Sequence, residues 1–170
     1  PNPLPVFHDR DCDLSIVRGK RVAMIGYGSQ GRTHALNLRD SGVTDIVVGL
    51  KVDSKTRALA QADGFPVLTA GEAAAQADVV AVMVPDSPDV EGVLTGDDGV
   101  FANAQPGTLI IDFSSIRPDV TVQLAEQAKA AGFRYLDAPV SGGIQGAAAA
   151  TLTFMLGGDE AIDDQLEALQ

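Results

Sequence analysis

The feature that most constrains this chain is the segment 26–31, which reads Gly-Tyr-Gly-Ser-Gln-Gly. It directly follows the apolar run Val22–Ile25, which has the composition of a buried parallel strand. The residues after it predict a helix over 30–41, which Gly42 would end. A G-x-G-x-x-G motif between a strand and a helix is typical of a loop that binds the pyrophosphate of a dinucleotide. The alternative is a glycine turn with a purely structural role.

Each of the three glycines has a predicted task. Gly26 permits the tight turn, Gly28 lets a pyrophosphate approach the backbone, and Gly31 lets the helix pack closely on the strand. The free amides and the positive dipole end at the start of the helix favour a bound phosphate. The predicted cofactor-binding residues of this loop are Gly26, Tyr27, Gly28, Ser29, Gln30 and Gly31.

The rest of the chain alternates between strand patterns and helix patterns. Further strands are predicted over residues 45–50, 66–68, 79–84, 108–112, 134–136 and 151–156. Further helices are predicted over residues 54–63, 69–76, 88–94, 118–131 and 159–169. Thr69 and Glu72 would form a capping box. The helix that begins at Pro118 is expected to face the core with Val122, Leu124, Ala125, Ala128 and Ala131. Repeated βα units predict an α/β fold with a doubly wound, mostly parallel Rossmann sheet and helices on both faces.

Composition narrows the class of protein and its partners. The chain has 170 residues and 45% hydrophobic residues, which predicts one domain with a sizeable core. Three early prolines and a polar run predict an N-terminal arm over 1–18, which leaves the Rossmann domain over 19–170. The net charge of −11 argues against nucleic acid or an anionic membrane as partner. A single cysteine and the lack of a long apolar span predict a cytoplasmic protein. The arm contains His8 and Cys12, but without a second ligand cluster we expect it to be solvated and to hold no metal.

The loop after the second strand bears on the choice of cofactor. NAD-specific sites place an acid near this point to bind the ribose 2′-hydroxyl, and Leu50 cannot do so. The loop instead carries cations and short hydroxyls, namely Lys51, Ser54, Lys55, Thr56 and Arg57. Such a cluster suits a 2′-phosphate and predicts NADP(H) as cofactor. The alternative is a solvated helix start with incidental lysines, and Asp53 is the main argument for it.

The first part of the chain resembles ketol-acid reductoisomerases. The matching stretches are Asp9–Leu14, Gly26–Gly31 and His34–Gly42, so the resemblance covers about residues 7–65. In that family Lys51, Ser54 and Thr56 would belong to the loop that binds the 2′-phosphate. The resemblance implies reduction and isomerisation of acetohydroxy acids with NADPH and magnesium. The family's metal-binding acids and its catalytic histidine stretch are not found in this sequence.

From about residue 78 the chain instead resembles β-hydroxyacid dehydrogenases, such as tartronate semialdehyde reductase and 3-hydroxyisobutyrate dehydrogenase. The matches are Val84–Asp89, Pro106–Thr108, Ile111–Ile116, Asp137–Gly143 and Gly157–Glu160. The resemblance implies that the nicotinamide side is lined by Val84, Pro85, Asp89 and Ser115, and that the substrate carboxylate is held by Ser141, Gly142 and Gly143. Two departures are Ala150, where glycine is usual, and Gln30, where methionine is usual.

The two resemblances meet between about residues 60 and 80. A natural hybrid and an engineered chimera both account for this, and we favour the chimera. The catalytic lysine of the dehydrogenases and the helical domain that closes both active sites are not found. We therefore expect an NADP(H)-binding domain of a hydroxyacid oxidoreductase that is not catalytically complete, and that handles a small hydroxy or keto acid only if a helical domain completes it. Exposed apolar surface would favour a homo-oligomer. The alternative is a recombined or designed scaffold with weak or no cofactor binding.

Overall fold

The computed structural model describes residues 6–158, so the helix predicted over 159–169 lies outside the described residues. The elements follow one another as η1 (Asp9–Asp11), α1 (Ser15–Arg18), β1 (Val22–Ile25), α2 (Ser29–Asp40), β2 (Ile46–Gly49), α3 (Arg57–Ala62), β3 (Val67–Leu68), α4 (Ala70–Ala74), β4 (Val79–Val82), α5 (Ser87–Thr95), α6 (Val100–Asn103), β5 (Leu109–Asp112), α7 (Pro118–Ala130), β6 (Arg134–Asp137), β7 (Val140–Ser141), α8 (Gly143–Ala148) and β8 (Thr153–Phe154). Among residues 6–158, each helix is too short or too polar to span a lipid bilayer.

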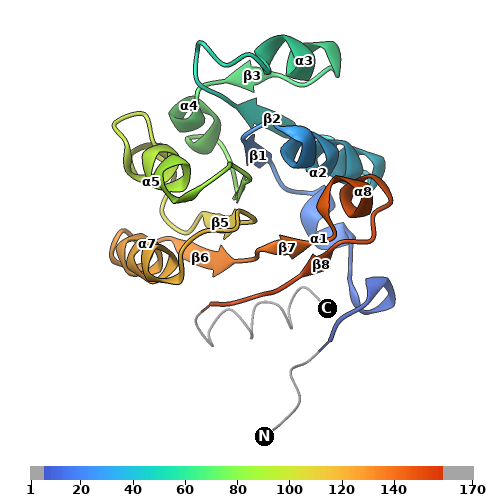
Figure 1. Cartoon of the computed structure of the whole chain (residues 1–170). Coiled ribbons are helices and arrows are strands. Elements are labelled where there is room, and N and C mark those ends of the chain that lie inside the picture. Colours follow the sequence, from blue (N-terminus) through green and yellow to red (C-terminus); the bar gives the residue numbers. More distant parts are fainter. Residues whose placement is uncertain (1–5, 159–170) are drawn as a thin grey trace, which may run out of the picture.

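The centre of the molecule is a six-stranded sheet with the strand order β3-β2-β1-β4-β5-β6 (Figure 1). Every neighbouring pair in it is parallel. This order places two βαβαβ halves side by side and reverses the direction of winding between β1 and β4. The predicted doubly wound Rossmann sheet is confirmed. Ligands of such sheets bind beyond the carboxyl ends of the strands at this point of reversal.

Successive side chains of β1 point to opposite faces of the sheet, and each face has its own hydrophobic core cluster. Val22 and Met24 pack in a cluster with residues of α2 and α3. Ala23 and Ile25 face the other way, into a cluster with residues of α4, α5, α6 and α7. All four residues of β1 are buried, as expected of a central strand covered on both faces.

The C-terminal part of the described chain forms a separate small unit. Strands β7 and β8 pair antiparallel, with Val140 opposite Phe154, and do not join the main sheet. The predicted strand over 151–156 is therefore wrong in its length, since β8 has only two residues. Pro139 follows β6 and cannot donate to a ladder, so the chain leaves the main sheet there. Helix α8 packs against α2, and the Asn37 side chain donates to the Ala147 carbonyl at 3.1 Å.

Two helices differ from the predictions near the candidate site. Helix α3 begins at Arg57 and not at Ser54, because residues 51–57 form turns in which Ser54 and Thr56 bond to each other through their hydroxyls at 3.0 Å. Helix α6 was not predicted, because its four residues are too short to show a helical period.

Helix α7 is rotated relative to the prediction. Val122 is 58% exposed, whereas Val120 is buried with Leu124 and Ala128. Ala131 is also exposed. The buried residues therefore recur every four positions along one stripe, and the helix packs that stripe on the sheet. The predicted capping box of α4, by contrast, is confirmed.

Candidate cofactor-binding site

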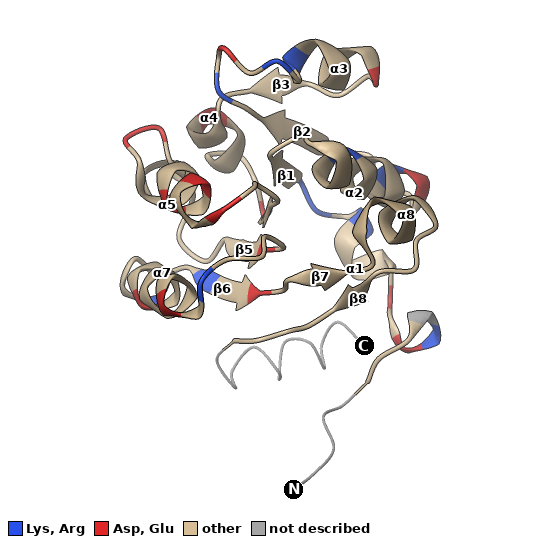
Figure 2. Ribbon diagram, in the orientation of Figure 1, with Lys and Arg blue, Asp and Glu red and all other residues tan. Residues whose placement is uncertain are grey.

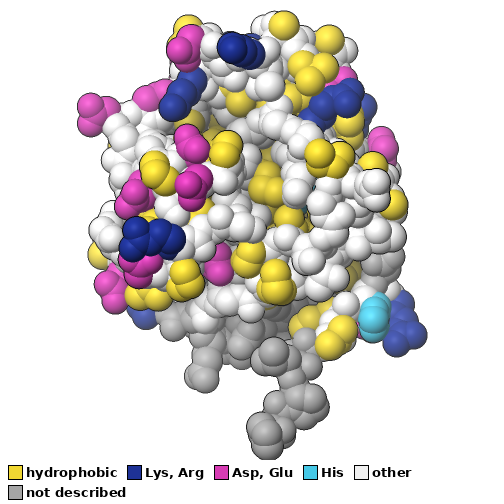
Figure 3. All heavy atoms as spheres, viewed as in Figure 1, with side chains coloured by type: hydrophobic (Ala, Val, Ile, Leu, Met, Phe, Trp, Pro, Cys, Tyr) yellow, Lys and Arg dark blue, Asp and Glu magenta, His cyan; other side chains and the backbone are white. Residues whose placement is uncertain are grey.

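A cavity of about 810 Å³ lies at the carboxyl ends of β1, β2 and β4, where the strand order reverses. In the space-filling view this face is hollowed, with hydrophobic side chains at the floor (Figure 3). Five segments of the chain line the cavity. The first two are the glycine loop with the end of β1 (Ile25–Gly31) and the end of β2 with the loop after it (Gly49–Lys51, Asp53, Ser54 and Thr56). The others are Ala70, the segment after β4 with α5 and the following turn (Met83–Pro85, Asp89, Gly92, Val93, Gly96, Asp97 and Asp98), and Ser115.

The glycine loop has the geometry that its sequence predicted. Gly26 has φ 99°, and a Cβ there would lie 2.2 Å from the Met83 carbonyl oxygen. A Cβ on Gly31 would lie 2.5 Å from the Gly26 carbonyl oxygen, so helix and strand can pack this closely only around glycine. Gly28 has no atom within 4 Å of an added Cβ and leaves open space. The loop thus combines close packing behind it with room in front.

The start of α2 offers hydrogen-bond groups to this space. Gly28 is the N-cap, and the amide of Arg32 makes the first backbone bond, to the Gly28 carbonyl at 2.9 Å. The three amides before it have no partner inside the helix. The side-chain Oε1 of Gln30 is buried without a hydrogen-bond partner in the described structure. A ligand with anionic oxygens and an N–H donor would satisfy these groups.

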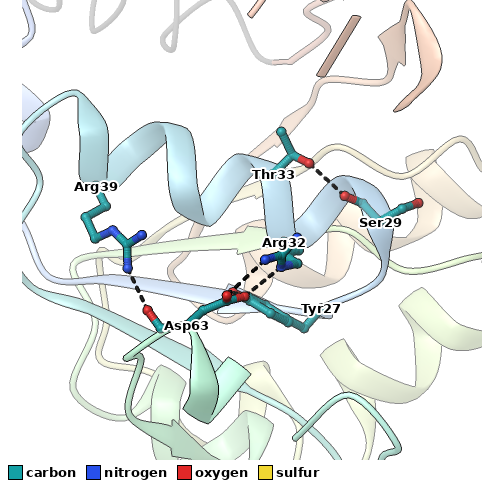
Figure 4. A network of polar contacts seen from close by, with 6 residues as sticks. All are labelled: Tyr27, Ser29, Arg32, Thr33, Arg39 and Asp63. Atoms are coloured by element: carbon teal, nitrogen blue, oxygen red, sulfur yellow. Dashed lines mark hydrogen bonds and ion pairs between the residues drawn. The ribbon is translucent and has the colours of Figure 1, made fainter. Parts of the chain in front are cut away.

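The side chain of Tyr27 does not serve the cavity. It is 2% exposed, and its hydroxyl donates to Oδ2 of Asp63 at 2.8 Å (Figure 4). Burial, and then the bond to Asp63, raise the pKa of this phenol. Only the backbone of Tyr27 is therefore available to a cofactor. The motif alone does not show that the side chain and the backbone of this residue have different roles.

The predicted cationic cluster is reduced to one lysine. Lys51, Ser54 and Thr56 line the cavity, together with Asp53. Lys55 and Arg57 are not in its wall.

Arg57 was expected in this cluster, and its guanidinium is used elsewhere. It donates to the carbonyl of Leu50 at 3.1 Å and to that of Val67 at 3.3 Å, with longer bonds to those of Lys51 and Leu68. This arginine ties β2, β3 and the loop together and does not face an anion.

The opposite end of the cavity is built on a buried polar network. Val84, Pro85, Asp89 and Ser115 line this end. Behind them the Val84 amide donates to Oγ of Ser114 at 3.1 Å, and the Ser114 amide donates to Asp112 at 2.9 Å. The hydroxyl of Tyr135 donates to Asp112 at 3.1 Å, and burial raises the pKa of this carboxyl group. Sequence reasoning missed Asp112 and Tyr135, although an acid at the end of an apolar strand was a signal.

The predicted carboxylate-binding residues lie outside this cavity. Ser141 ends β7, and Gly142 and Gly143 follow with φ 128° and 59°. None of the three is part of the cavity wall. The structure therefore does not bring them together with Val84, Pro85, Asp89 and Ser115, which were predicted to line the nicotinamide side.

Charged residues are unevenly distributed over the segments that contribute to the cavity wall (Figure 2). The loop between β2 and α3 carries two lysines together with Asp53, whereas the charged residues of α5 and of the turn after it are all acidic. Asp97 and Asp98 of that turn line the cavity and were not predicted. Within residues 6–158 no group of three His, Cys, Asp or Glu side chains is placed to hold a metal ion.

Comparisons with known proteins agree on the kind of domain. A family model described as the NAD binding domain of 6-phosphogluconate dehydrogenase matches residues 21–169. Ketol-acid reductoisomerase (NADP(+)) of Leifsonia xyli subsp. xyli is 51% identical over 106 residues, and that of Beutenbergia cavernae is 50% identical over the same length. Each alignment covers 62% of this chain and 30% of the relative.

Solved structures match over more of the chain. The 3-hydroxyisobutyrate dehydrogenase of Mycobacterium tuberculosis, solved with L-serine, is 38% identical with a TM-score of 0.76, over 88% of this chain and 50% of that one. Psf3 in complex with NADP+ is 27% identical with a TM-score of 0.73, over 87% of this chain and 54% of that one. The chain thus spans about a third of the curated relatives and about half of these solved structures.

Proposed function

The chain belongs to the family of the NAD binding domain of 6-phosphogluconate dehydrogenase, and from this premise we propose that it binds NADP(H) in the cavity between the glycine loop and the loop after β2. It is an NAD(P)-binding Rossmann domain of the type found in hydroxyacid dehydrogenases and ketol-acid reductoisomerases. The observation that carries the proposal is the cavity at the reversal of strand order, with the glycine loop in its wall.

The residues present fit a dinucleotide. Close packing at Gly26 and Gly31 leaves no room for side chains, while Gly28 leaves open space where a pyrophosphate would approach. The amides of Ser29, Gln30 and Gly31 would donate to it. The unpartnered Oε1 of Gln30 is an acceptor for a cofactor N–H group. The cavity is also of a size common for cofactor sites.

The preference for NADP(H) over NAD(H) is supported by the loop after β2. Lys51 would pair with the 2′-phosphate, and the adjacent hydroxyls of Ser54 and Thr56 would donate to it. The side chain of Leu50 offers no acceptor to a free 2′-hydroxyl. The curated relatives carry NADP(+) in their names, and Psf3 was solved with NADP+.

The nicotinamide would lie at the end lined by Val84, Pro85, Asp89 and Ser115. The cofactor, when bound, supplies hydride chemistry of the kind that hydroxyacid oxidoreductases use. In this chain the buried bonds from Val84 to Ser114 and on to Asp112 would hold that wall in place. We propose that Ser141, Gly142 and Gly143 contact a small hydroxy or keto acid only when a further domain completes the site.

We infer that the two halves of the sheet have different origins. The basis is the two resemblances: the reductoisomerase of Leifsonia xyli is 51% identical over 106 residues, and the dehydrogenase structure is 38% identical over 88% of the chain. An alignment of 106 residues extends beyond residue 80 wherever it begins, so the similarity to reductoisomerases does not end within residues 60–80. The region 60–80, where the sequence predicts that the two resemblances meet, contains the crossover from β3 to β4, which joins the two βαβαβ halves. A break at this crossover leaves each half intact. A source genome with one uninterrupted gene for both halves would show a natural hybrid and contradict an engineered chimera.

We further propose a cytoplasmic location, because the described part shows one exposed free cysteine, Cys12. Self-association as a homo-oligomer is supported by exposed apolar side chains near β8, among them Phe154, Met155 and Leu156. Sedimentation velocity at high protein concentration tests the second point, and a strictly monomeric profile would contradict it.

The cofactor proposal is tested by fluorescence titration with NADPH and NADH. Lys51→Glu should weaken NADPH binding roughly ten-fold or more, because a charge-assisted contact to phosphate is worth about 1.5–3 kcal/mol. NADH binding should change far less. Lys55→Glu is the matched control, because it makes the same charge change in the same loop but outside the cavity wall.

The outcomes separate the alternatives. If the wild-type protein gives no saturable signal up to millimolar NADPH, the chain is a scaffold without cofactor binding. If Lys51→Glu weakens both cofactors equally, Lys51 does not contact the 2′-phosphate.

A further inference from the structure

We propose that Asp63 is a positioning residue that holds the glycine loop and the 2′-phosphate loop in register, and so sets the preference for NADP(H) from outside the cavity. This inference rests on the proposed function. Asp63 follows α3 as its C-cap and is not part of the cavity wall. It acts through other residues and does not contact the cofactor.

The carboxylate of Asp63 collects donors from both ends of the glycine motif (Figure 4). The hydroxyl of Tyr27, which lies between Gly26 and Gly28, donates to Oδ2 at 2.8 Å. The guanidinium of Arg32, directly after Gly31, donates to Oδ2 at 2.6 Å and to Oδ1 at 2.9 Å. One side chain is therefore bonded to the residue inside the turn and to the residue after it.

The backbone of Asp63 is held from the same helix. Arg39, near the end of α2, donates to the Asp63 carbonyl oxygen at 2.6 Å. Its guanidinium also lies 5.0 Å from the centre of the Phe65 ring, and the Tyr27 ring meets Phe65 edge to face at 6.0 Å. The C-terminal end of α3 is thus fixed to α2 by polar and aromatic contacts together.

The other end of α3 is fixed to the sheet. Arg57, its first residue, donates to the carbonyls of Leu50 and Val67. The residue before it, Thr56, lines the cavity and bonds to Ser54. Helix α3 therefore connects the 2′-phosphate loop at its N-terminal end with the carboxylate of Asp63 at its C-terminal end.

The chemistry of this contact requires a carboxylate. Bonds from Arg32 and then from Tyr27 lower the pKa of Asp63 to about 2, so the group remains ionised over the range in which a cofactor would bind. The Asp63 side chain is only 15% exposed, which protects the bidentate pair with Arg32 from full solvent screening. An amide at this position would present an N–H group to a guanidinium and lose that pairing.

Loss of this anchor should affect the two cofactors differently. The glycine loop keeps its own backbone bonds and close glycine packing, so the pyrophosphate contacts survive in part. The 2′-phosphate loop would remain tied to the sheet through Arg57, and the end of α3 to α2 through Arg39, but the loop would lose its link to the glycine motif and be less preorganised. NADPH needs both loops, whereas NADH needs chiefly the glycine loop.

The experiment measures dissociation constants for NADPH and NADH and the thermal midpoint of each variant. Tyr27→Phe should weaken NADPH binding by roughly five-fold, in line with the loss of one hydrogen bond, and Asp63→Asn by at least as much, because it also breaks the bidentate pair with Arg32. NADH binding should fall by about two-fold or less, so the ratio of the two affinities drops. Asp45→Asn is the matched control, because it breaks an ion pair with Arg21 of similar length, 2.7 Å, at the amino ends of the strands.

The affinity ratio distinguishes positioning from general stabilisation. A lower thermal midpoint with an unchanged NADPH to NADH ratio in both variants would overturn the inference. If Asp63→Asn does not fold, Tyr27→Phe decides, since it removes one hydroxyl and keeps the buried ring. A shift in the ratio for Asp45→Asn would also overturn it, because the effect would then not be specific to this carboxylate. Failure of the wild-type protein to bind NADPH would instead refute the proposed function.

Discussion

Two acids at the ends of neighbouring strands differ in their hydrogen-bond partners, and one of them lowers the stability of the domain at neutral pH. Asp112 ends β5 and Asp137 ends β6, and the two are directly paired in the parallel register. Asp112 has the Ser114 amide and the Tyr135 hydroxyl as partners, whereas Asp137 accepts no side-chain hydrogen bond within the described residues. Burial and then the charge of Asp112 raise the pKa of Asp137 to about 6. Asp137 is therefore a charge that folding makes unfavourable at neutral pH.

The pH dependence of stability follows from the sign of this shift. Between about pH 4 and pH 6 the native state holds more protons on Asp137 than the unfolded chain, so the free energy of unfolding falls as pH rises through this window. Asp137→Asn should be more stable than wild type at pH 8, and the difference should shrink below about pH 4. Urea unfolding at several pH values measures this. Asp119→Asn is the control, because Arg117 lowers the pKa of Asp119 and no gain is expected. Equal stability of Asp137→Asn and wild type at pH 8 would contradict the account.

Helix ends give the clearest regularity at the scale of elements. In α2, α3 and α7 the residue after the C-cap is a glycine with positive φ, namely Gly42, Gly64 and Gly132. Helix α8 ends with the same hydrogen-bond pattern, in which the Thr151 amide donates to the Gly146 carbonyl and the Ala150 amide to that of Ala147. There the corresponding residue is Ala150, with φ 54°. Ala150, where the dehydrogenases usually have glycine, therefore adopts the left-handed backbone conformation that favours glycine.

Replacing this alanine should stabilise the protein. Ala150→Gly relieves the contact of Cβ with its own backbone in the left-handed region and should raise the free energy of unfolding by about 0.5–1 kcal/mol. Chemical denaturation measures the change. Gly132→Ala is the mirror control, since an added Cβ there meets no atom within 4 Å but would adopt φ 84°. It should destabilise by a similar amount. A loss of stability in Ala150→Gly would show that the turn is not strained.

At the scale of the whole molecule, the residues proposed to bind the cofactor and those proposed to bind the substrate lie apart within residues 6–158. The described residues that line the cavity include one lysine, Lys51, which lies at the proposed 2′-phosphate end. Ser141 lies outside the cavity wall, in the small β7–β8 unit. The residues proposed to bind NADP(H) thus come from the loops at the carboxyl ends of the main sheet, whereas the residues proposed to bind a substrate carboxylate do not.

We therefore expect the 170-residue chain to bind NADPH without turning over acetohydroxy acids or tartronate semialdehyde at a useful rate. Loss of one positioned general acid costs about 100-fold to 10,000-fold, and loss of substrate orientation costs more. Absorbance at the NADPH band, with and without substrate, measures the rate. Oxidation clearly above the substrate-free background, abolished by Ser141→Ala, would contradict this expectation and indicate that a second chain completes the site.

The local structure of this protein follows from residues that are close together in the sequence. The strand Val22–Ile25, the glycine turn and the capping box at Thr69 depend on residues close together in the chain, so periodicity and spacing were enough to predict them. The same holds for the doubly wound sheet, because repeated βα units with right-handed crossovers allow few other arrangements.

Only the tertiary structure decided what each side chain in these segments does. Tyr27 belongs to the glycine motif, yet its hydroxyl bonds to Asp63, 36 residues away. Arg57 was predicted as part of a cationic cluster for a 2′-phosphate, but it donates to the carbonyl of Leu50, just after β2, and to that of Val67 in β3. The partners of these side chains come from segments that meet only after the sheet has formed. The spacing of residues along the sequence cannot specify such contacts, because they depend on how the helices pack on the strands. A rotation of a helix about its axis, as in α7, changes which of its residues are buried.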